Sequence, residues 1–358
     1  MADPVKLLIS ARDPGAATHL GQFAKHVKKD PRYKLTLYAS PPASHFFDQL
    51  KLDYQLTPPG GDIQTIAYDI IRNEKPNIIL TGLSDPDIGI DEALQRAANN
   101  VPCYTYQDFW GCINPKQMYA NSHFLTLDPV ATTLSLKLGA ASATTIGSLN
   151  HDKLKYRECL LARQTFRQKH KIQSKDVVAG LALQPLWHLA SYRKSIAFFL
   201  QNLNADRLLV RFHPKQAGIK KTQILSFINR HYKYPHQIDN STILNFTVGC
   251  DLITSAFSNT NFDLVMANRL SMKGFATSYM LWYNKELINW FEQYNHIRQH
   301  PLHQLGASKS LLNQSNLRFC LSHSQINASK IRQTQAARRL QHRTGANSQL
   351  AEFLLDSL

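Results

Sequence analysis

The stretch Arg207-Leu-Leu-Val-Arg-Phe-His-Pro-Lys215 joins a short apolar run to a basic, histidine-containing end. The apolar part predicts a buried β-strand, which Pro214 ends because proline cannot donate the next ladder hydrogen bond. Arg211, His213 and Lys215 would then lie at the carboxyl end of the strand. Ligands bind at this edge in open α/β sheets, so the stretch is a candidate ligand site. The alternative is an ordinary strand end with surface cations.

Short apolar runs alternate with helical patterns on both sides of this stretch. This alternation predicts an α/β fold with parallel, doubly wound sheets. The chain has 358 residues, and single cores stop growing at about 250–300 residues, so we expect two Rossmann-like domains facing a cleft. The expected strands are 6–10, 34–38, 77–81, 102–106, 123–127, 143–146, 176–183, 207–212, 235–238, 251–254 and 270–275. The expected helices are 18–27, 44–50, 63–73, 91–99, 129–138, 187–203, 222–231 and 259–267.

Composition shifts divide the chain further. We expect an N-terminal domain over 1–150 and a second domain over 173–328, joined by a basic linker with a helix over 151–172. Residues 329–358 predict a C-terminal helix, broken near Gly345, that packs back across the domains.

The formal charge of +16 favours acidic partners such as nucleic acid, an anionic membrane or phosphorylated substrates. No nucleic-acid-binding module accompanies the charge, so we expect no nucleic acid partner. Much of the charge falls in 151–172 and 330–343, which we interpret as solvated helix faces.

No run approaches the ~18–20 apolar residues of a membrane span. The five cysteines lack C-x-x-C spacing and indicate reduced thiols. We expect a cytoplasmic protein, with peripheral contact at the inner face of an anionic membrane as an alternative.

The loop after the first strand carries Asp13, Gly15 and His19 and opens a helix. Gly15 and the small residues after it would let the backbone approach a substrate closely. The loop matches neither G-x-G-x-x-G nor the P-loop pattern. Asp13 or His19 could serve as a general base for an acceptor hydroxyl. Alternatively, Asp13 only caps the helix.

Two further strand ends carry acids. Asp85 follows the strand 77–81 and suits sugar hydroxyls, whereas Asp91 is interpreted as a helix N-cap. Asp108 and Trp110 follow the strand 102–106, where an aromatic face beside a carboxylate suits a sugar; the alternative is ordinary core. No ligand cluster completes a metal site, so we expect none.

A second candidate phosphate site lies one βα unit after His213. A strand ends in hydroxyl residues and a helix begins at once, so side-chain hydroxyls and helix N–H groups would cradle a phosphate. Asp263, about one turn into this helix, could reach ribose hydroxyls. A simple Ser/Asn helix cap is the alternative. The residues concerned are Thr254, Ser255, Ser258, Asn259 and Thr260.

These motifs resemble a known group. The second half is similar to the nucleotide-binding half of GT-B glycosyltransferases, especially the bacterial His-Pro-motif group of sialic acid, Kdo and teichoic-acid transferases. His213-Pro214 and the Ser255/Ser258 strand end carry the resemblance, and Asp263 stands where many GT-B enzymes have a glutamate. Asp13-Pro-Gly15 and Asp108-Phe-Trp110 resemble capsule-type proteins, and 146–150 resembles the end of a GT-B N-terminal domain.

The resemblance implies a metal-independent glycosyltransferase with no cofactor, in which 1–150 binds the acceptor and 173–328 the donor. The donor would be a CMP- or UDP-sugar whose phosphate His213-Pro214 holds. The acceptor would be a glycan, a lipid-linked molecule or a small molecule. Asp13 is the first candidate base and Asp108 the second. A sugar-nucleotide epimerase of related fold, or a non-catalytic nucleotide- or glycan-binding protein, remains an alternative.

Overall fold

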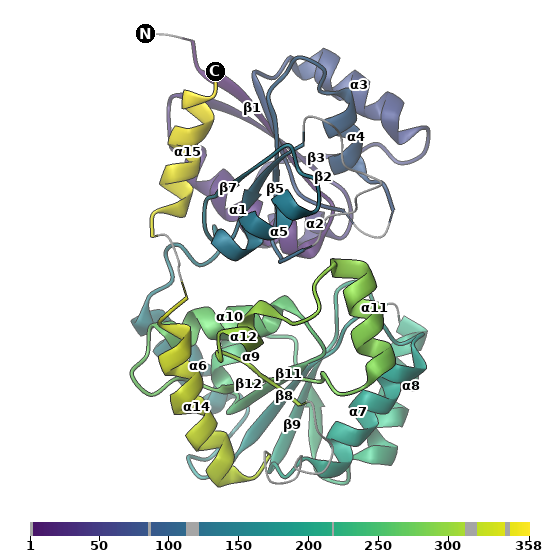
Figure 1. Cartoon of the computed structure of the whole chain (residues 1–358), viewed down its shortest axis with the longest axis vertical. Helices are drawn as coiled ribbons and strands as arrows, with labels where there is room; N and C mark the ends of the chain where they lie inside the picture. The colour runs from purple at the N-terminus through teal and green to yellow at the C-terminus, as the bar shows by residue number, and fades with distance from the viewer. Residues whose placement is uncertain (1–2, 85–86, 112–121, 217, 312–320, 341–343) are drawn as a thin grey trace. The chain divides into compact units, whose positions relative to one another are not determined.

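The computed structural model describes residues 3–84, 87–111, 122–216, 218–311, 321–340 and 344–358 (Figure 1). The chain divides into two compact units. Unit 1 comprises Met1–Lys153, Tyr294–His296 and Gln341–Leu358, and unit 2 comprises Leu154–Gln293 and Ile297–Leu340. Each unit has its own parallel sheet, which confirms the predicted α/β class with two doubly wound sheets.

Unit 1 holds a seven-stranded sheet in the order β3-β2-β1-β4-β5-β6-β7. Strand β1 pairs in parallel with both β2 and β4, so the winding direction reverses at β1. Ligands bind at such a switch point in open α/β sheets. The strands are β1 (Val5–Ala11), β2 (Tyr33–Ala39), β3 (Gln55–Leu56), β4 (Ile78–Thr81), β5 (Cys103–Tyr106), β6 (His123–Thr126) and β7 (Ser142–Thr145).

The helices of unit 1 cover both faces of this sheet. Helix α1 packs with α2 and α15, and α3 packs with α4. The apolar residues of these helices recur at helical spacing and bury one stripe each. The helices are α1 (Pro14–Val27), α2 (Ala43–Gln49), α3 (Ile63–Glu74), α4 (Ile90–Ala97), α5 (Pro129–Lys137) and α15 (Ala346–Asp356).

Unit 2 holds a six-stranded parallel sheet in the order β10-β9-β8-β11-β12-β13. Here the switch point is β8, which pairs with both β9 and β11. Strand β8 is buried along its whole length, as expected for a central parallel strand. The strands are β8 (Val178–Ala182), β9 (Arg207–Arg211), β10 (His236–Ile238), β11 (Leu252–Ser255), β12 (Thr277–Met280) and β13 (Lys309–Ser310).

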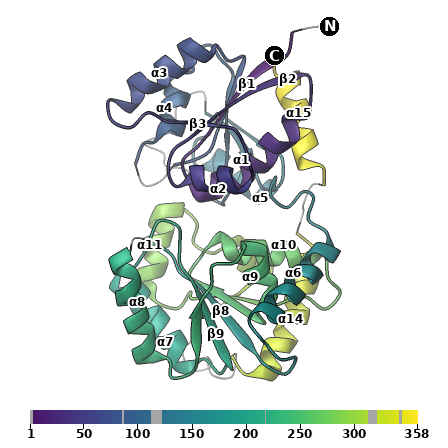
Figure 2. The ribbon, with the colours of Figure 1, turned by 180° about the vertical axis from the view of Figure 1, so that it is seen from behind.

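The helices of unit 2 lie in two groups, visible from both sides of the molecule (Figures 1 and 2). One group contains α7 and α8, which pack together, and the other contains α6, α9, α10 and α14. The helices are α6 (Tyr156–Lys169), α7 (Ala190–Asn202), α8 (Gly218–His231), α9 (Ile243–Gly249), α10 (Asn259–Arg269), α11 (Lys285–Asn295), α12 (Pro301–Gln304) and α14 (His323–Ala337).

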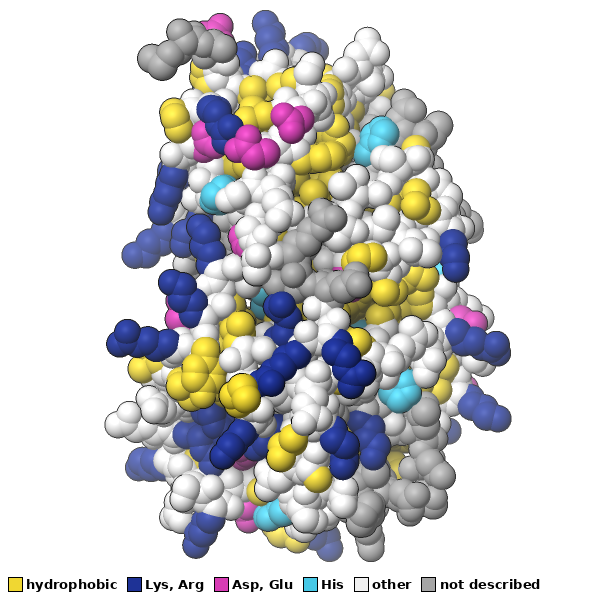
Figure 3. Space-filling view, turned by 60° about the vertical axis from the view of Figure 1, so that its left-hand side comes forward, with side chains coloured by type: hydrophobic (Ala, Val, Ile, Leu, Met, Phe, Trp, Pro, Cys, Tyr) yellow, Lys and Arg dark blue, Asp and Glu magenta, His cyan; other side chains and the backbone are white. Residues whose placement is uncertain are grey.

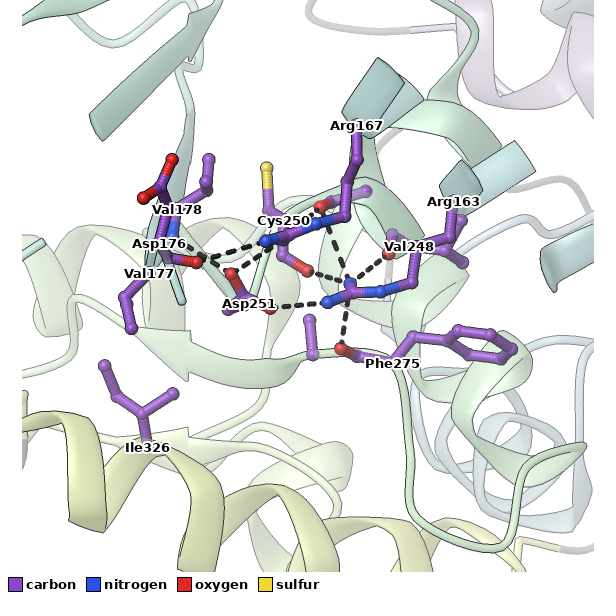
Figure 4. A network of polar contacts seen from close by, with 12 residues as sticks. Arg163, Arg167, Asp176, Val177, Val178, Val248, Cys250, Asp251, Phe275 and Ile326 are labelled. Carbon is purple, nitrogen blue, oxygen red and sulfur yellow. Dashed lines mark hydrogen bonds and ion pairs between the residues drawn. The ribbon is translucent and has the colours of Figure 1, made fainter. Parts of the chain in front are cut away.

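Two arginines of α6 are partly buried in ion pairs, which corrects the interpretation of the basic linker as a purely surface feature. Arg163 Nη2 lies 2.6 Å from Asp251 Oδ1, and Arg167 Nη1 lies 3.0 Å from Asp251 Oδ2. Arg163 also donates to the carbonyls of Val248 and Cys250 (Figure 4). The pair attaches α6 to the start of β11.

The predicted strand 270–275 is wrong. Ser271 Oγ accepts hydrogen bonds from the N–H groups of Lys273 and Gly274, and Gly274 has φ +73°. These bonds make a turn, and the strand of this region is β12, which follows it. The expected C-terminal helix consists of two helices, α14 in unit 2 and α15 in unit 1. Gly345 precedes α15 with φ +77°, which confirms the break.

Across the described ranges, every helix is too short or too polar to cross a lipid bilayer.

Candidate functional site

Three loops that follow β8, β9 and β11 are tied together at the switch point of unit 2. The side-chain oxygen of Gln184 accepts the N–H of Phe257 at 2.9 Å. The amide of Gln216 donates to the carbonyl of Gln184 at 3.4 Å and accepts the N–H of His213 at 2.9 Å. Both glutamines are buried. Sequence reasoning missed them, because a glutamine in a loop carries no motif of its own.

His213 is held as a neutral hydrogen-bond donor. Its Nδ1 lies 3.1 Å from the backbone nitrogen of Lys215 and accepts that N–H. The proton of the neutral ring is therefore assigned to Nε2. Burial, with a smaller contribution from the charge of Lys215, lowers the pKa of His213 to about 4. His213, which was expected to donate as a charged group, is thus an uncharged imidazole at neutral pH. The next two residues, Pro214 and Lys215, are exposed.

Arg211 has a structural partner that the sequence did not reveal. Its Nη1 lies 2.6 Å from Asp239 Oδ2 and 2.7 Å from the carbonyl oxygen of Ser241. Its guanidinium also lies over the ring of Phe246, 5.6 Å from the centroid. Because the Asp239 carboxylate is buried, Arg211 neutralises it and joins β9 to the segment after β10. His213 and Lys215 are therefore the better placed members of the predicted basic trio.

The hydroxyl-rich end of β11 forms a capped helix start. Ser255 Oγ accepts the N–H of Ser258 at 2.9 Å and donates to the side-chain oxygen of Asn261. Ser258 is the N-cap of α10, and its Oγ accepts the N–H of Thr260 at 3.2 Å. The simple helix cap, which was the alternative to a phosphate site, is thus present. It places the positive end of the α10 dipole directly after β11.

Asn261 joins this turn to the neighbouring strand. Its Nδ2 donates to Ser278 Oγ at 2.8 Å and to the carbonyl of Tyr279 at 2.9 Å. Thr254 Oγ1 is buried without a hydrogen-bond partner among the described residues. Asn259 is the first residue of α10, and Asp263 lies one turn further and is partly exposed.

The switch point of unit 1 is built around a buried carboxyl group. Asp91 Oδ1 accepts from Ser10 Oγ at 2.5 Å, and Oδ2 accepts from Ser84 Oγ at 2.8 Å and the N–H of Arg12 at 3.1 Å. The N-cap of α4 is Gly89, so the interpretation of Asp91 as the cap is wrong. Asp91 instead joins the ends of β1 and β4.

Glu92 lies next to Asp91 and is also buried. Its two oxygens accept the N–H groups of Ser84 at 2.6 Å and Gly89 at 2.9 Å. Burial, followed by the charge of Asp91, raises the pKa of Glu92 to about 7, and burial also raises the pKa of Asp91. A carboxyl group that titrates near neutrality can exchange a proton. The sequence did not indicate Glu92, because its pattern was that of an ordinary capping glutamate.

Asp13 lies at the start of α1, where its Oδ1 is 3.5 Å from Arg12 Nε. Gly15 is in the first turn of the same helix. The small residues beside it serve packing, because a Cβ added at Gly82 would lie only 2.4 Å from Ala16 Cβ. Gly82, just after β4, therefore lets Ala16 of α1 pack closely against it, whereas the close approach of the backbone at Gly15 to a substrate stays a prediction. Asp85 lies outside the described residues.

His19 meets the end of β5. Its Nδ1 lies 3.0 Å from the hydroxyl oxygen of Tyr106, and this hydroxyl donates its proton to the carbonyl of Gly147 at 2.9 Å. Burial, and then the nearby His151, lowers the pKa of His19 well below its ordinary range. His19 is therefore a neutral, buried imidazole.

The loop after β5 contains Asp108 and Trp110. Asp108 is partly exposed, whereas Trp110 is completely buried and its Nε1 donates to Asp128 Oδ2 at 2.9 Å. Because both faces of the indole are covered, Trp110 is a core residue rather than a sugar platform. Asp128 in turn caps α5 by accepting the N–H of Ala131.

Among the side chains that the structure describes, no three His, Cys, Asp or Glu residues gather as a metal site would require.

The sequence matches no protein-family model and no curated protein. The structure is similar over almost its whole length to solved structures. The UDP-GlcNAc 2-epimerase from Neisseria meningitidis, bound to UDP-GlcNAc, has 11% identity and a TM-score of 0.63 over 98% of this chain and 100% of that one. HepE from Anabaena in complex with UDP-glucose has 12% identity and a TM-score of 0.64, covering 99% and 100%. A glycosyltransferase from Rickettsia africae has 11% identity and a TM-score of 0.61, covering 99% of each chain.

At such identities the similarity is one of fold. The two parallel α/β units with switch points at β1 and β8 thus make up a GT-B-like fold of two Rossmann-like domains.

Proposed function

We propose that this chain binds a nucleotide-sugar through unit 2 and transfers the sugar to an acceptor hydroxyl as a metal-independent glycosyltransferase. The observation that supports this most directly is the network at the switch point of unit 2. Gln184 and Gln216 connect the His213 loop to Phe257, next to the start of α10. An imidazole donor and the positive end of a helix dipole are thereby tied into one set of loops, an arrangement suited to phosphate oxygens.

On the donor side, each group has a distinct role. The Nε2–H of His213 and the ammonium of Lys215 would hold phosphate oxygens of a UDP- or CMP-sugar, and the α10 start with Asn259 would face the same group. Such donors stabilise the charge that develops on the leaving phosphate and can replace a metal ion. Asp263 would accept hydrogen bonds from the ribose hydroxyls. The complexes of HepE with UDP-glucose and of the Neisseria meningitidis epimerase with UDP-GlcNAc support a uridine nucleotide as the first ligand to test.

In unit 1, Asp13 remains the first candidate base for the acceptor hydroxyl, with Asp108 second. Both carboxylates follow strands at the carboxyl edge of the sheet and are partly exposed. His19 is neutral, but it is buried, so we do not choose it as the base for an acceptor hydroxyl. We assign it instead to positioning Tyr106 and the loop after β7. The acceptor would be a glycan, a lipid-linked molecule or a small molecule.

An epimerase is the second candidate. Several structures of similar fold are named as UDP-GlcNAc 2-epimerases.

Nucleotide binding is tested by thermal unfolding with UDP, CMP and GDP in turn. A ligand at 100 times its Kd stabilises the native state by about 2.7 kcal/mol. We expect UDP or CMP to raise the melting temperature. His213→Ala should weaken that binding roughly ten- to a hundredfold in calorimetry, because it removes one hydrogen bond to a charged group. The control His45→Ala changes an exposed histidine of α2 in unit 1 and should bind like the unaltered chain. Equal nucleotide affinity for His213→Ala would refute the assignment.

Product analysis separates the two activities. NMR of a UDP-sugar incubated with the chain alone should show no conversion if the chain is a transferase, and an epimerised sugar if it is an epimerase. With acceptors added, a transferase should release UDP and the glycosylated acceptor, and Asp13→Asn should abolish turnover while leaving donor affinity intact. Nucleotide binding without either product would identify a non-catalytic binding protein.

A further inference from the structure

A mixed apolar and basic surface lies on unit 2, formed by the start of α6, the turn before β12 and α14. Tyr156, Met272 and Ile331 are large hydrophobic residues that remain 45%, 78% and 47% exposed. Lys155 precedes Tyr156, Lys273 follows Met272, and Arg338 lies just after α14; all three are exposed. We call these six residues the apolar–basic face. Figure 3 shows Lys and Arg side chains with hydrophobic side chains among them on the lower part of the molecule, where α6 and α14 come forward.

Contacts between the three segments show that the face is continuous. Arg338 Nη2 lies 3.1 Å from Met272 Sδ and also donates to the carbonyl of Ser271. The ring of Tyr156 lies 5.8 Å from that of Phe275 at the other end of the turn. Ile331 precedes Arg338 by seven residues, which is two helical turns, so both lie on the same side of the helix.

The turn that presents Met272 is well defined. Ser271 Oγ accepts two backbone N–H groups, and Gly274 has φ +73°. A Cβ at Gly274 would lie 2.2 Å from Thr334 Oγ1 and 3.0 Å from the side chain of Lys330, so the turn packs tightly on α14. The turn therefore holds Met272 outward, and its exposed side chain adds to those of Tyr156 and Ile331 in a patch that an external partner could cover.

Charge decides the kind of partner. The segments 268–275 and 323–340 contain no Asp or Glu, and the start of α6 adds one exposed carboxylate, Glu158, beside the exposed cations Lys155 and Arg157. The face therefore combines net positive charge with exposed apolar side chains. This combination is typical of surfaces that bind at the boundary between lipid headgroups and acyl chains. We propose that the apolar–basic face docks unit 2 on an anionic lipid surface, with Met272 inserted and Lys155, Lys273 and Arg338 over the headgroups. This goes beyond nucleotide binding and does not depend on it.

The test is sedimentation of the full chain with vesicles. We expect binding to vesicles that contain phosphatidylglycerol and none to pure phosphatidylcholine. Each Lys or Arg near an anionic leaflet strengthens binding about fivefold, so Lys273→Glu should weaken it by more than that and added salt should do the same. Met272→Ser should weaken binding without changing its salt dependence. Both positions are exposed on a surface turn, and equal melting temperatures would show that the variants fold.

Two matched controls address charge and apolarity separately. Lys194→Glu makes the same charge change on α7, in the other group of helices, and Leu136→Ser removes an exposed apolar side chain from α5 in unit 1. Both should bind vesicles like the unaltered chain. Absence of binding to anionic vesicles, or binding that Met272→Ser and Lys273→Glu leave unchanged, would overturn the proposal. So would binding to duplex nucleic acid in place of vesicles.

Discussion

At the scale of single residues, the chain keeps several histidines neutral by burying them. His213 has a pKa of about 4 and His300 one of about 3, in both cases chiefly because burial penalises the charged ring. His300 also caps α12, since its Nδ1 accepts the N–H of Leu302 at 3.2 Å. His213 can therefore donate one hydrogen bond from the same nitrogen across the neutral pH range, without a change of charge.

This burial predicts a loss of stability in mild acid. Between the lowered pKa of the folded chain and the ordinary value of 6.5, the unfolded chain binds more protons, so stability falls as the pH falls from 6.5 toward 4. The raised pKa of Glu92 acts in the opposite direction over this range, so the histidine contribution is measured as the difference in the urea midpoint between pH 7.5 and pH 5 for the unaltered chain and for His300→Asn. His300→Asn keeps a capping side chain but removes one titrating group, so its midpoint should depend less on pH. An unchanged pH dependence would show that His300 does not contribute. The exposed His45→Asn serves as the control.

At the scale of elements, one carboxylate organises the amino-terminal edge of the sheet in unit 2. Asp251 accepts hydrogen bonds from Arg163, from Arg167 and from the N–H of Val178, the last at 3.0 Å. It thus connects α6, β11 and β8 (Figure 4). The proposed phosphate site lies at the opposite edge of the same strands, so this network supports the frame and takes no part in binding.

Replacing this carboxylate should destabilise unit 2. Asp251→Asn leaves two partly buried guanidinium groups without their counter-charge, and we expect a loss of roughly 2–4 kcal/mol. Three of the four tryptophans, Trp187, Trp282 and Trp290, belong to unit 2, so tryptophan fluorescence during urea unfolding measures the effect. The control Asp69→Asn breaks an exposed pair with Arg72 on α3 and should change stability by less than about 0.5 kcal/mol. Equal effects of the two variants would contradict the prediction.

At the scale of the whole molecule, unit 1 is completed by the far end of the chain. Asp152 accepts the N–H groups of Gly345, Ala346 and Asn347 and so caps α15 from a distant segment. The hydroxyl of Tyr33 donates to the carbonyl of Ala351 in the same helix. The chain leaves unit 1 near residue 153, touches it again at 294–296 and returns to it near residue 341, so α15 packs with α1 as part of unit 1.

Removing this cap should destabilise one unit selectively. We expect Asp152→Ala to lower the stability of unit 1 by about 1–2 kcal/mol, the usual value of a helix cap. Hydrogen exchange should become faster in α15 and β2 and stay unchanged in β8 and β9. Asp53→Ala, which alters an exposed carboxylate of unit 1, should leave all four elements unchanged. Equal acceleration in both sheets would argue against an effect confined to unit 1.

Sequence reasoning predicted most elements because their signals are local. Apolar runs bounded by polar or turn residues identified β1, β4, β8 and β9, and Pro214 located the end of β9. It failed at 270–275, where Leu270, Met272 and Phe275 resemble a strand. The structure leaves Met272 exposed, because Ser271 and Gly274 favour a turn. It also missed α9 and α11, although Leu287 and Phe291 of α11 are buried at helical spacing.

The sequence by itself determined most of the order of strands and helices, the α/β class and the position of His213 at a strand end, since periodicity and proline act over a few residues. The tertiary structure alone decided the partners of the polar groups. Arg211 pairs with Asp239, Arg163 with Asp251, and Gln184 receives the N–H of Phe257. These partners meet only after the strands are ordered in the sheet, and that order depends on packing between residues far apart in the chain.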